Sequence, residues 1–97
     1  MAAALECCLV RIEGRVQGVG FREACVDQAR SLRLAGWVRN RLDDSVEALL
    51  QGPPDALTRM QAWLERGPPA ARVLRVQSTP QPLPSPPLAG FERRPTA

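Results

Sequence analysis

The chain has 97 residues, of which 44% are hydrophobic and 24% charged, and this composition is typical of one small globular domain. All 13 basic residues are arginine, so the absence of lysine and histidine excludes Schiff-base chemistry, a Walker lysine and an imidazole base or ligand. The net charge of +3 is modest and only 4% of the residues are aromatic. A single-stranded nucleic-acid platform, which interleaves basic and aromatic side chains, is therefore disfavoured.

Neither a membrane segment nor a secretory signal is expected. No apolar run approaches the ~20 residues that span a bilayer. Residues 1–10 lack the charged n-region and the long apolar h-region of a signal peptide. The odd number of cysteines (Cys7, Cys8 and Cys25) argues against a disulfide framework and, without histidine, falls short of a structural zinc site. We expect a cytoplasmic protein whose thiols are small buried hydrophobic groups.

The first half of the chain begins with a predicted strand, Leu5–Glu13, because Cys8, Val10 and Ile12 alternate onto one face. A glycine-rich loop follows. Small and apolar side chains then recur with the spacing of one helix face, which predicts a helix over Phe21–Arg33. The stripe consists of Phe21, Ala24, Cys25, Ala29 and Leu32.

The middle of the chain reads as a hairpin followed by a second helix. Strands are predicted at Leu34–Arg41 and Val46–Leu50, and Asp43–Ser45 supplies turn residues between them. A helix is predicted over Asp55–Arg66, ended by Gly67 and the two prolines after it.

The last part of the chain is rich in proline. Val73–Ser78 is predicted as a fourth strand, and the proline-dense segment Thr79–Pro87 as a stiff surface loop, because proline removes the donors of a sheet ladder. A docking role for this segment as a polyproline II ligand is the alternative. Gly90–Arg93 is expected to form a short edge strand.

The order β-α-β-β-α-β, with this short fifth strand, defines the predicted fold class. It is an α+β, ferredoxin-like sandwich, in which both helices cover one face of an antiparallel sheet. We expect a single domain over residues 1–97, with a core of about residues 5–93.

The glycine-rich loop Gly14–Arg22 is the main candidate functional segment. Three glycines within seven positions can turn backbone N–H groups toward an anion, and a helix N-terminus follows. Arg15 and Arg22 flank the loop, and guanidinium groups match phosphate oxygens. The spacing is neither that of a P-loop nor G-x-G-x-x-G. From these residues alone, an anion-binding loop and a plain tight turn remain equally open.

This loop and the segment Gly36–Asn40 (GWVRN) together resemble the acylphosphatase family, and the similarity extends over roughly Cys7–Phe91. The resemblance implies the α/β sandwich and an enzyme that hydrolyses the carboxyl–phosphate bond of acyl phosphates. It also implies site residues: Arg22 would bind phosphate oxygens and Asn40 would hold the attacking water. The backbone that cradles the phosphoryl group would be that of Arg15, Val16, Gln17, Gly18, Val19 and Gly20.

The same resemblance implies that the enzyme requires no metal or other cofactor. The expected partners are a small acyl phosphate and, as a bound anion, inorganic phosphate or sulfate. We expect a monomer that binds neither nucleic acid nor membrane. Arginine and backbone N–H groups suffice for phosphoryl transfer, which is catalysed mainly by positioning and charge stabilisation.

Several alternatives stay open. The chain could be a non-catalytic ferredoxin-like domain that binds an anion or a protein, with Arg22 a solvated arginine and Asn40 a turn residue. It could resemble the acylphosphatase-like domain of hydrogenase-maturation proteins, which act on carbamoyl phosphate. Two features depart from the family: Asp43-Asp44 replaces a frequent Asp-Gly, and the unusual segments Pro80–Pro87 and Phe91–Ala97 leave the register of the last strand open.

Overall fold

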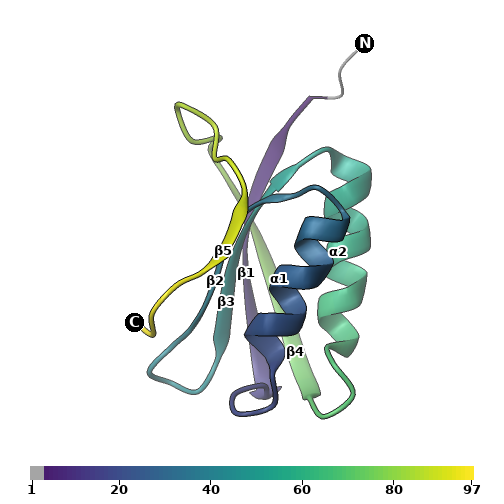
Figure 1. The fold of residues 1–97 in the computed structure, drawn as a ribbon, viewed down its shortest axis with the longest axis vertical. Helices are drawn as coiled ribbons and strands as arrows, with labels where there is room; N and C mark the ends of the chain where they lie inside the picture. Colours follow the sequence, from purple (N-terminus) through teal and green to yellow (C-terminus); the bar gives the residue numbers. More distant parts are fainter. Residues whose placement is uncertain (1–3) are drawn as a thin grey trace.

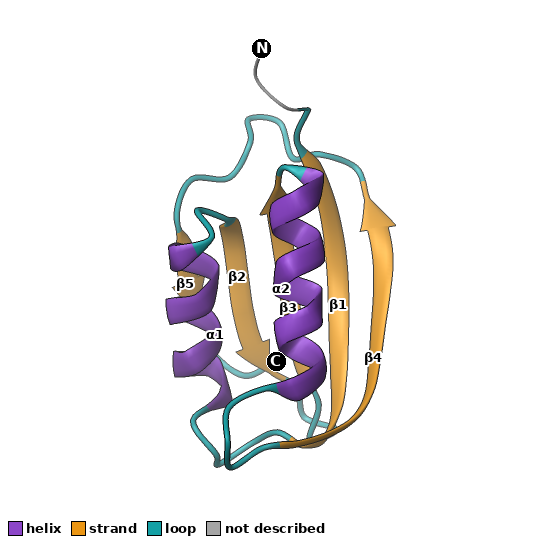
Figure 2. Cartoon of the chain, turned by 90° about the vertical axis from the view of Figure 1, so that its right-hand side faces the viewer, coloured by secondary structure: helices purple, strands orange, loops and turns teal. Residues whose placement is uncertain are grey.

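A computed structural model describes residues 4–97; the first three residues, which begin the N-terminal stretch considered above, lie outside the described residues. Five strands form one sheet in the order β4-β1-β3-β2-β5, and both helices cover the same face of it (Figures 1 and 2). The predicted ferredoxin-like class is therefore confirmed. The elements are β1 Glu6–Arg15, α1 Phe21–Ser31, β2 Ala35–Asn40, β3 Val46–Gly52, α2 Pro54–Arg66, β4 Arg72–Gln81 and β5 Phe91–Arg93.

The sheet is mixed. The pairs β1–β3, β1–β4 and β2–β3 are antiparallel, as predicted, whereas β5 runs parallel to β2, with Gly36 opposite Phe91 and Val38 opposite Arg93. The backbone continues this pairing beyond β5, because the Arg94 N–H donates to the Val38 carbonyl at 2.8 Å. The C-terminal segment therefore follows β2 toward its end.

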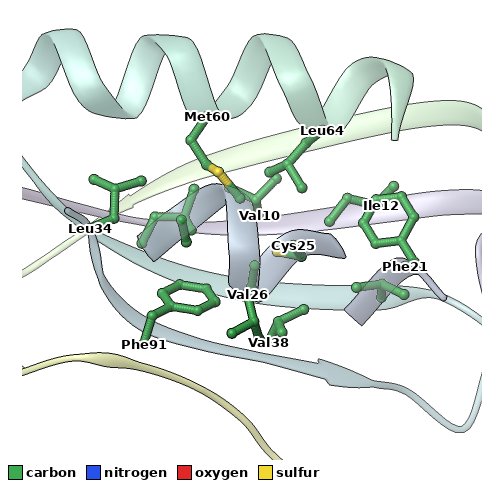
Figure 3. Packing of buried hydrophobic residues seen from close by; sticks show 14 of the residues in the cluster. Val10, Ile12, Phe21, Cys25, Val26, Leu34, Val38, Met60, Leu64 and Phe91 are labelled. Carbon is green, nitrogen blue, oxygen red and sulfur yellow. The ribbon is translucent and has the colours of Figure 1, made fainter. Parts of the chain in front are cut away.

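Alternation along the strands and the helical stripes place the core between the sheet and the two helices (Figure 3). The aromatic rings of Phe21 and Trp63, from α1 and α2, pack at 5.7 Å between centroids. The largest fully buried side chains are Phe21, Ile12, Leu50, Met60, Leu64, Val10, Val16, Val38, Val46 and Cys25.

Several predicted boundaries were wrong. Strand β1 continues past Glu13 to Arg15, so Gly14 and Arg15 belong to the strand and not to the glycine-rich loop, and β3 continues past Leu50 to Gly52. Strand β4 continues past Ser78 to Gln81, so Thr79 and Pro80 belong to the strand and not to the loop. Proline is tolerated there because β4 is an edge strand, where a missing N–H can face away from the sheet. Helix α1 ends at Ser31 and not at Arg33, because Arg33 has a φ of 58°, outside the helical range.

The loop after β4 is tied to the sheet by one buried glutamine. Gln51, in β3, has a side chain that is only 4% exposed. Its Nε2 donates to the Leu88 carbonyl at 3.0 Å, and its Oε1 accepts from the Leu88 N–H at 2.8 Å. This pair imitates a backbone ladder and fixes the proline-rich connection beside β3.

All three cysteines are free and buried, as predicted. Burial of Cys25 on the inner face of α1 raises its pKa from 9.0 to about 12. The unfolded thiol ionises near pH 9, whereas the folded thiol stays neutral. The contribution of Cys25 to stability is therefore complete below pH 9 and is lost as the pH rises toward 12.

We expect the difference in unfolding free energy between wild type and Cys25→Ala to shrink by about 1.4 kcal/mol between pH 8 and pH 10. Urea unfolding at both pH values measures it, and an unchanged difference would contradict this origin.

Candidate active site

The loop between β1 and α1 places backbone N–H groups at one end of the sheet. Gly18 and Gly20 have φ values of 72° and 76°, in the left-handed region that glycine adopts without strain. Helix α1 begins directly after Gly20, and no side chain caps its first turn. The first N–H groups of α1 consequently keep their capacity to bind an anion, and the helix dipole favours negative charge there.

A cavity of about 120 Å³ lies against this loop. Arg22, in the first turn of α1, and Asn40, the last residue of β2, both line it although they are 18 positions apart. Of the predicted site residues, the cavity brings together Val16, Gly18, Gly20, Arg22 and Asn40. Arg15, Gln17 and Val19 do not line it.

The side chain of Gln17 does not face the cavity but contacts the connection between β2 and β3. Its Nε2 donates to the carbonyls of Arg41 and Ser45, both at 2.9 Å. These two residues belong to the β2–β3 connection, which begins directly after Asn40. Gln17 therefore fixes the glycine loop to the strand end that carries Asn40.

The position of Asn40 is also set by its backbone. Asn40 pairs with Val46 in the β2–β3 ladder, and its carbonyl accepts the Ala97 N–H at 3.1 Å. Within residues 4–97, the side-chain hydrogen bonds and ion pairs include neither the Asn40 carboxamide nor the Arg22 guanidinium. Both groups thus line the cavity with their hydrogen-bonding capacity unused by the protein.

The turn that follows is held by Asp43. Its Oδ1 accepts from the Ser45 N–H at 3.1 Å and from the Ser45 hydroxyl at 2.6 Å, and these two bonds lower the pKa of the Asp43 carboxyl. Asp44 has a φ of 73°, so it occupies the left-handed position that glycine takes in an Asp-Gly turn. Aspartate tolerates this conformation better than most residues, and the departure at Asp43-Asp44 leaves the hairpin intact.

Sequence reasoning missed three residues of the cavity wall: Phe21, which was predicted only as a core residue, and Glu23 and Arg93, which form an ion pair with each other. Glu23 follows Arg22 in α1, and its exposure on the helix could be read from the sequence. Arg93 could not be placed, because the register of β5 was open. Only its parallel pairing with β2 brings Arg93 to the site.

A larger cavity, of about 730 Å³, lies at the opposite end of α1, beside Arg30 and Arg33. It contains none of the predicted site residues. Arg30 is engaged there in a structural contact, since its Nε and one terminal nitrogen donate to the Phe91 carbonyl at 3.2 and 3.0 Å. The smaller cavity is the better candidate for an anion site, because Arg22, Asn40 and the uncapped first turn of α1 line it.

Over residues 4–97, no three histidine, cysteine, aspartate or glutamate side chains gather as a metal site would require. No helix in the same range is both long and apolar enough to cross a membrane.

The architecture and this site define a ferredoxin-like α/β sandwich with a glycine loop, an arginine and an asparagine around one small cavity. The acylphosphatase family model matches residues 8–92. Acylphosphatase 1 of Ralstonia nicotianae is 56% identical over 95 residues, covering 98% of this chain and 93% of its own length. The chain belongs to the acylphosphatase family, which confirms the resemblance drawn from the two motifs.

Solved structures agree with this assignment. An acylphosphatase from Coxiella burnetii has a TM-score of 0.88 at 34% identity, covering 93% of both chains. The acylphosphatase from Bacillus subtilis has a TM-score of 0.85 at 34% identity, covering 94% of this chain and 99% of its own. The whole sandwich is therefore shared with these enzymes.

Proposed function

We propose that this acylphosphatase hydrolyses acyl phosphates to a carboxylate and inorganic phosphate by direct attack of water on phosphorus. The observation that carries the mechanism is the convergence of Arg22 and Asn40 on the cavity beside the glycine loop. Backbone N–H groups of residues 15–20 cradle the phosphoryl oxygens, Arg22 neutralises their charge, and Asn40 orients the water.

The available residue types suit this reaction. A carboxylate is a good leaving group, so the bond to phosphorus breaks without a strong general acid. As water attacks, a phosphoryl oxygen accepts its proton, and the electron pair of the broken bond leaves on the carboxylate. Catalysis then depends on positioning and on stabilising charge on the phosphoryl oxygens, which preorganised N–H groups and a guanidinium supply.

The remaining expectations extend this proposal. The enzyme acts as a cytoplasmic monomer on a small acyl phosphate, uses no cofactor, and binds inorganic phosphate or sulfate in the cradle. It takes no nucleic acid or membrane as partner. The family relationship and the small size of the cavity support a small anionic substrate.

Hydrolysis of benzoyl phosphate in the presence of EDTA tests the proposal. We expect turnover by the wild type and a loss of about 10²-fold or more in Asn40→Ala, because the water loses its orientation. Asn40→Asp should be equally poor, since a carboxylate of similar shape repels the phosphoryl group. Thermal unfolding of each variant controls for folding. A folded wild type without turnover would contradict the enzyme mechanism and favour a non-catalytic anion-binding domain.

A further inference from the structure

The ion pair between Glu23 and Arg93 lies in the wall of the cavity that also contains Arg22 and Asn40. Along β5, side chains alternate between the two faces of the sheet. Phe91 is 3% exposed, within the core beneath α1, and Arg93 lies on the same face. Arg93 therefore reaches the first turn of α1, where Arg22 and Glu23 lie.

The next residue, Arg94, is directed to the other face of the sheet. Its guanidinium lies 5.1 Å from the centre of the Trp37 ring, and its Nε contacts Glu92 at 3.2 Å. Two adjacent arginines thus have the same charge and nearly the same position in the chain. Only Arg93 lines the cavity.

The Glu23–Arg93 pair is exposed enough to open at little cost. The two side chains are 67% and 51% exposed, and exposed ion pairs contribute little to stability because water screens them. The pair engages one terminal nitrogen of Arg93. A guanidinium carries five N–H donors, so the others remain able to bind an anion.

When an anion binds, the charges of the cavity wall favour a change of partner for Arg93, from the Glu23 carboxylate to the anion. The charged side chains that line it are Arg22, Glu23 and Arg93, with a net charge of +1. A phosphate monoester carries a charge of about −1.5 to −2 near pH 7. Such an anion repels Glu23 and attracts Arg93, and its oxygens match the fork of a guanidinium in bidentate geometry.

We propose that Arg93 is a substrate-binding residue, which Glu23 holds at the wall of the cavity and which exchanges that carboxylate for the phosphoryl oxygens of the bound acyl phosphate. This inference rests on the proposed function, because it assumes that the phosphoryl group occupies the cavity beside Arg22. Glu23 competes with the anion for Arg93. It therefore weakens the hold on inorganic phosphate and eases the release of this product.

The experiment measures the dissociation constant of inorganic phosphate by titration calorimetry and the KM for benzoyl phosphate. The variants are Arg93→Gln, Glu23→Gln, their double mutant, and Arg94→Gln as the control with the same charge change on the opposite face. We expect Arg93→Gln to raise both constants about tenfold, and Glu23→Gln to lower them several-fold. Arg94→Gln should stay within twofold of the wild type.

The double mutant distinguishes two roles of Glu23: holding Arg93 until the anion replaces it, or only repelling the anion by its charge. If Glu23 acts by holding Arg93, most of the gain from Glu23→Gln disappears when Arg93 is absent. An equal gain in both backgrounds, or an Arg93→Gln variant that behaves like Arg94→Gln, would overturn the inference. Phosphate binding is read without turnover, so a folded wild type that binds phosphate but hydrolyses nothing would instead count against the proposed function.

Discussion

Replacing Arg22 by alanine should lower kcat/KM for benzoyl phosphate by about 10³-fold or more, the largest functional effect that we expect from a single substitution. The guanidinium lines the cavity with no partner among residues 4–97, at the start of a helix whose first turn is uncapped. A positive charge beside the positive end of a helix dipole is unfavourable unless an anion binds there. Steady-state kinetics on the folded variant measures the loss.

Two further substitutions make this prediction specific. Arg22→Lys keeps the charge but loses the planar fork, so it should recover only part of the activity. Arg59→Ala removes the same charge from an exposed position on α2, away from the cavity, and should retain the activity of the wild type. If Arg22→Ala kept more than a tenth of the activity, Arg22 would be a solvated helix residue and the proposed mechanism would be wrong.

The fold was largely predictable because its signals are local. The alternation of Cys8, Val10 and Ile12 and the stripe on Phe21–Arg33 each depend on spacing within one element, and the core of the structure follows them. The end of β4 was missed because Pro80 is acceptable only at the edge of a sheet. Which strand lies at the edge depends on long-range pairing, which no local pattern contains.

The site residues also separate into those that local sequence predicts and those that depend on long-range pairing. The glycine loop and Asn40 each belong to a short continuous motif, so their resemblance to the family could be recognised. The side chain of Gln17 could not be assigned, because its partners are the carbonyls of Arg41 and Ser45, across the connection between two strands. Arg93 depended on the parallel pairing of β5, which joins segments that are more than fifty residues apart.

Gly36, the first residue of the GWVRN motif, should be the position where a methyl group costs most stability. It pairs with Leu50 in the β2–β3 ladder and has a φ of 140°. A Cβ atom at Gly36 would lie 1.8 Å from the Leu49 carbonyl oxygen and 3.3 Å from the Phe91 ring. Because the clash is with backbone, the two strands would have to separate, and β2 carries Asn40 at its other end.

We expect Gly36→Ala to lower the free energy of unfolding by about 3 kcal/mol or more, through both the clash and the strained backbone. For a domain of this size, 3 kcal/mol corresponds to a fall in Tm of roughly 12–24 °C. Gly90→Ala is the matched control: it also has a positive φ, of 72°, but its Cβ would meet no atom within 4 Å. It should cost only about 1–2 kcal/mol, the price of the backbone conformation. Thermal and urea unfolding distinguish the two, and equal losses would mean that β2 and β3 do not approach as closely as the ladder requires.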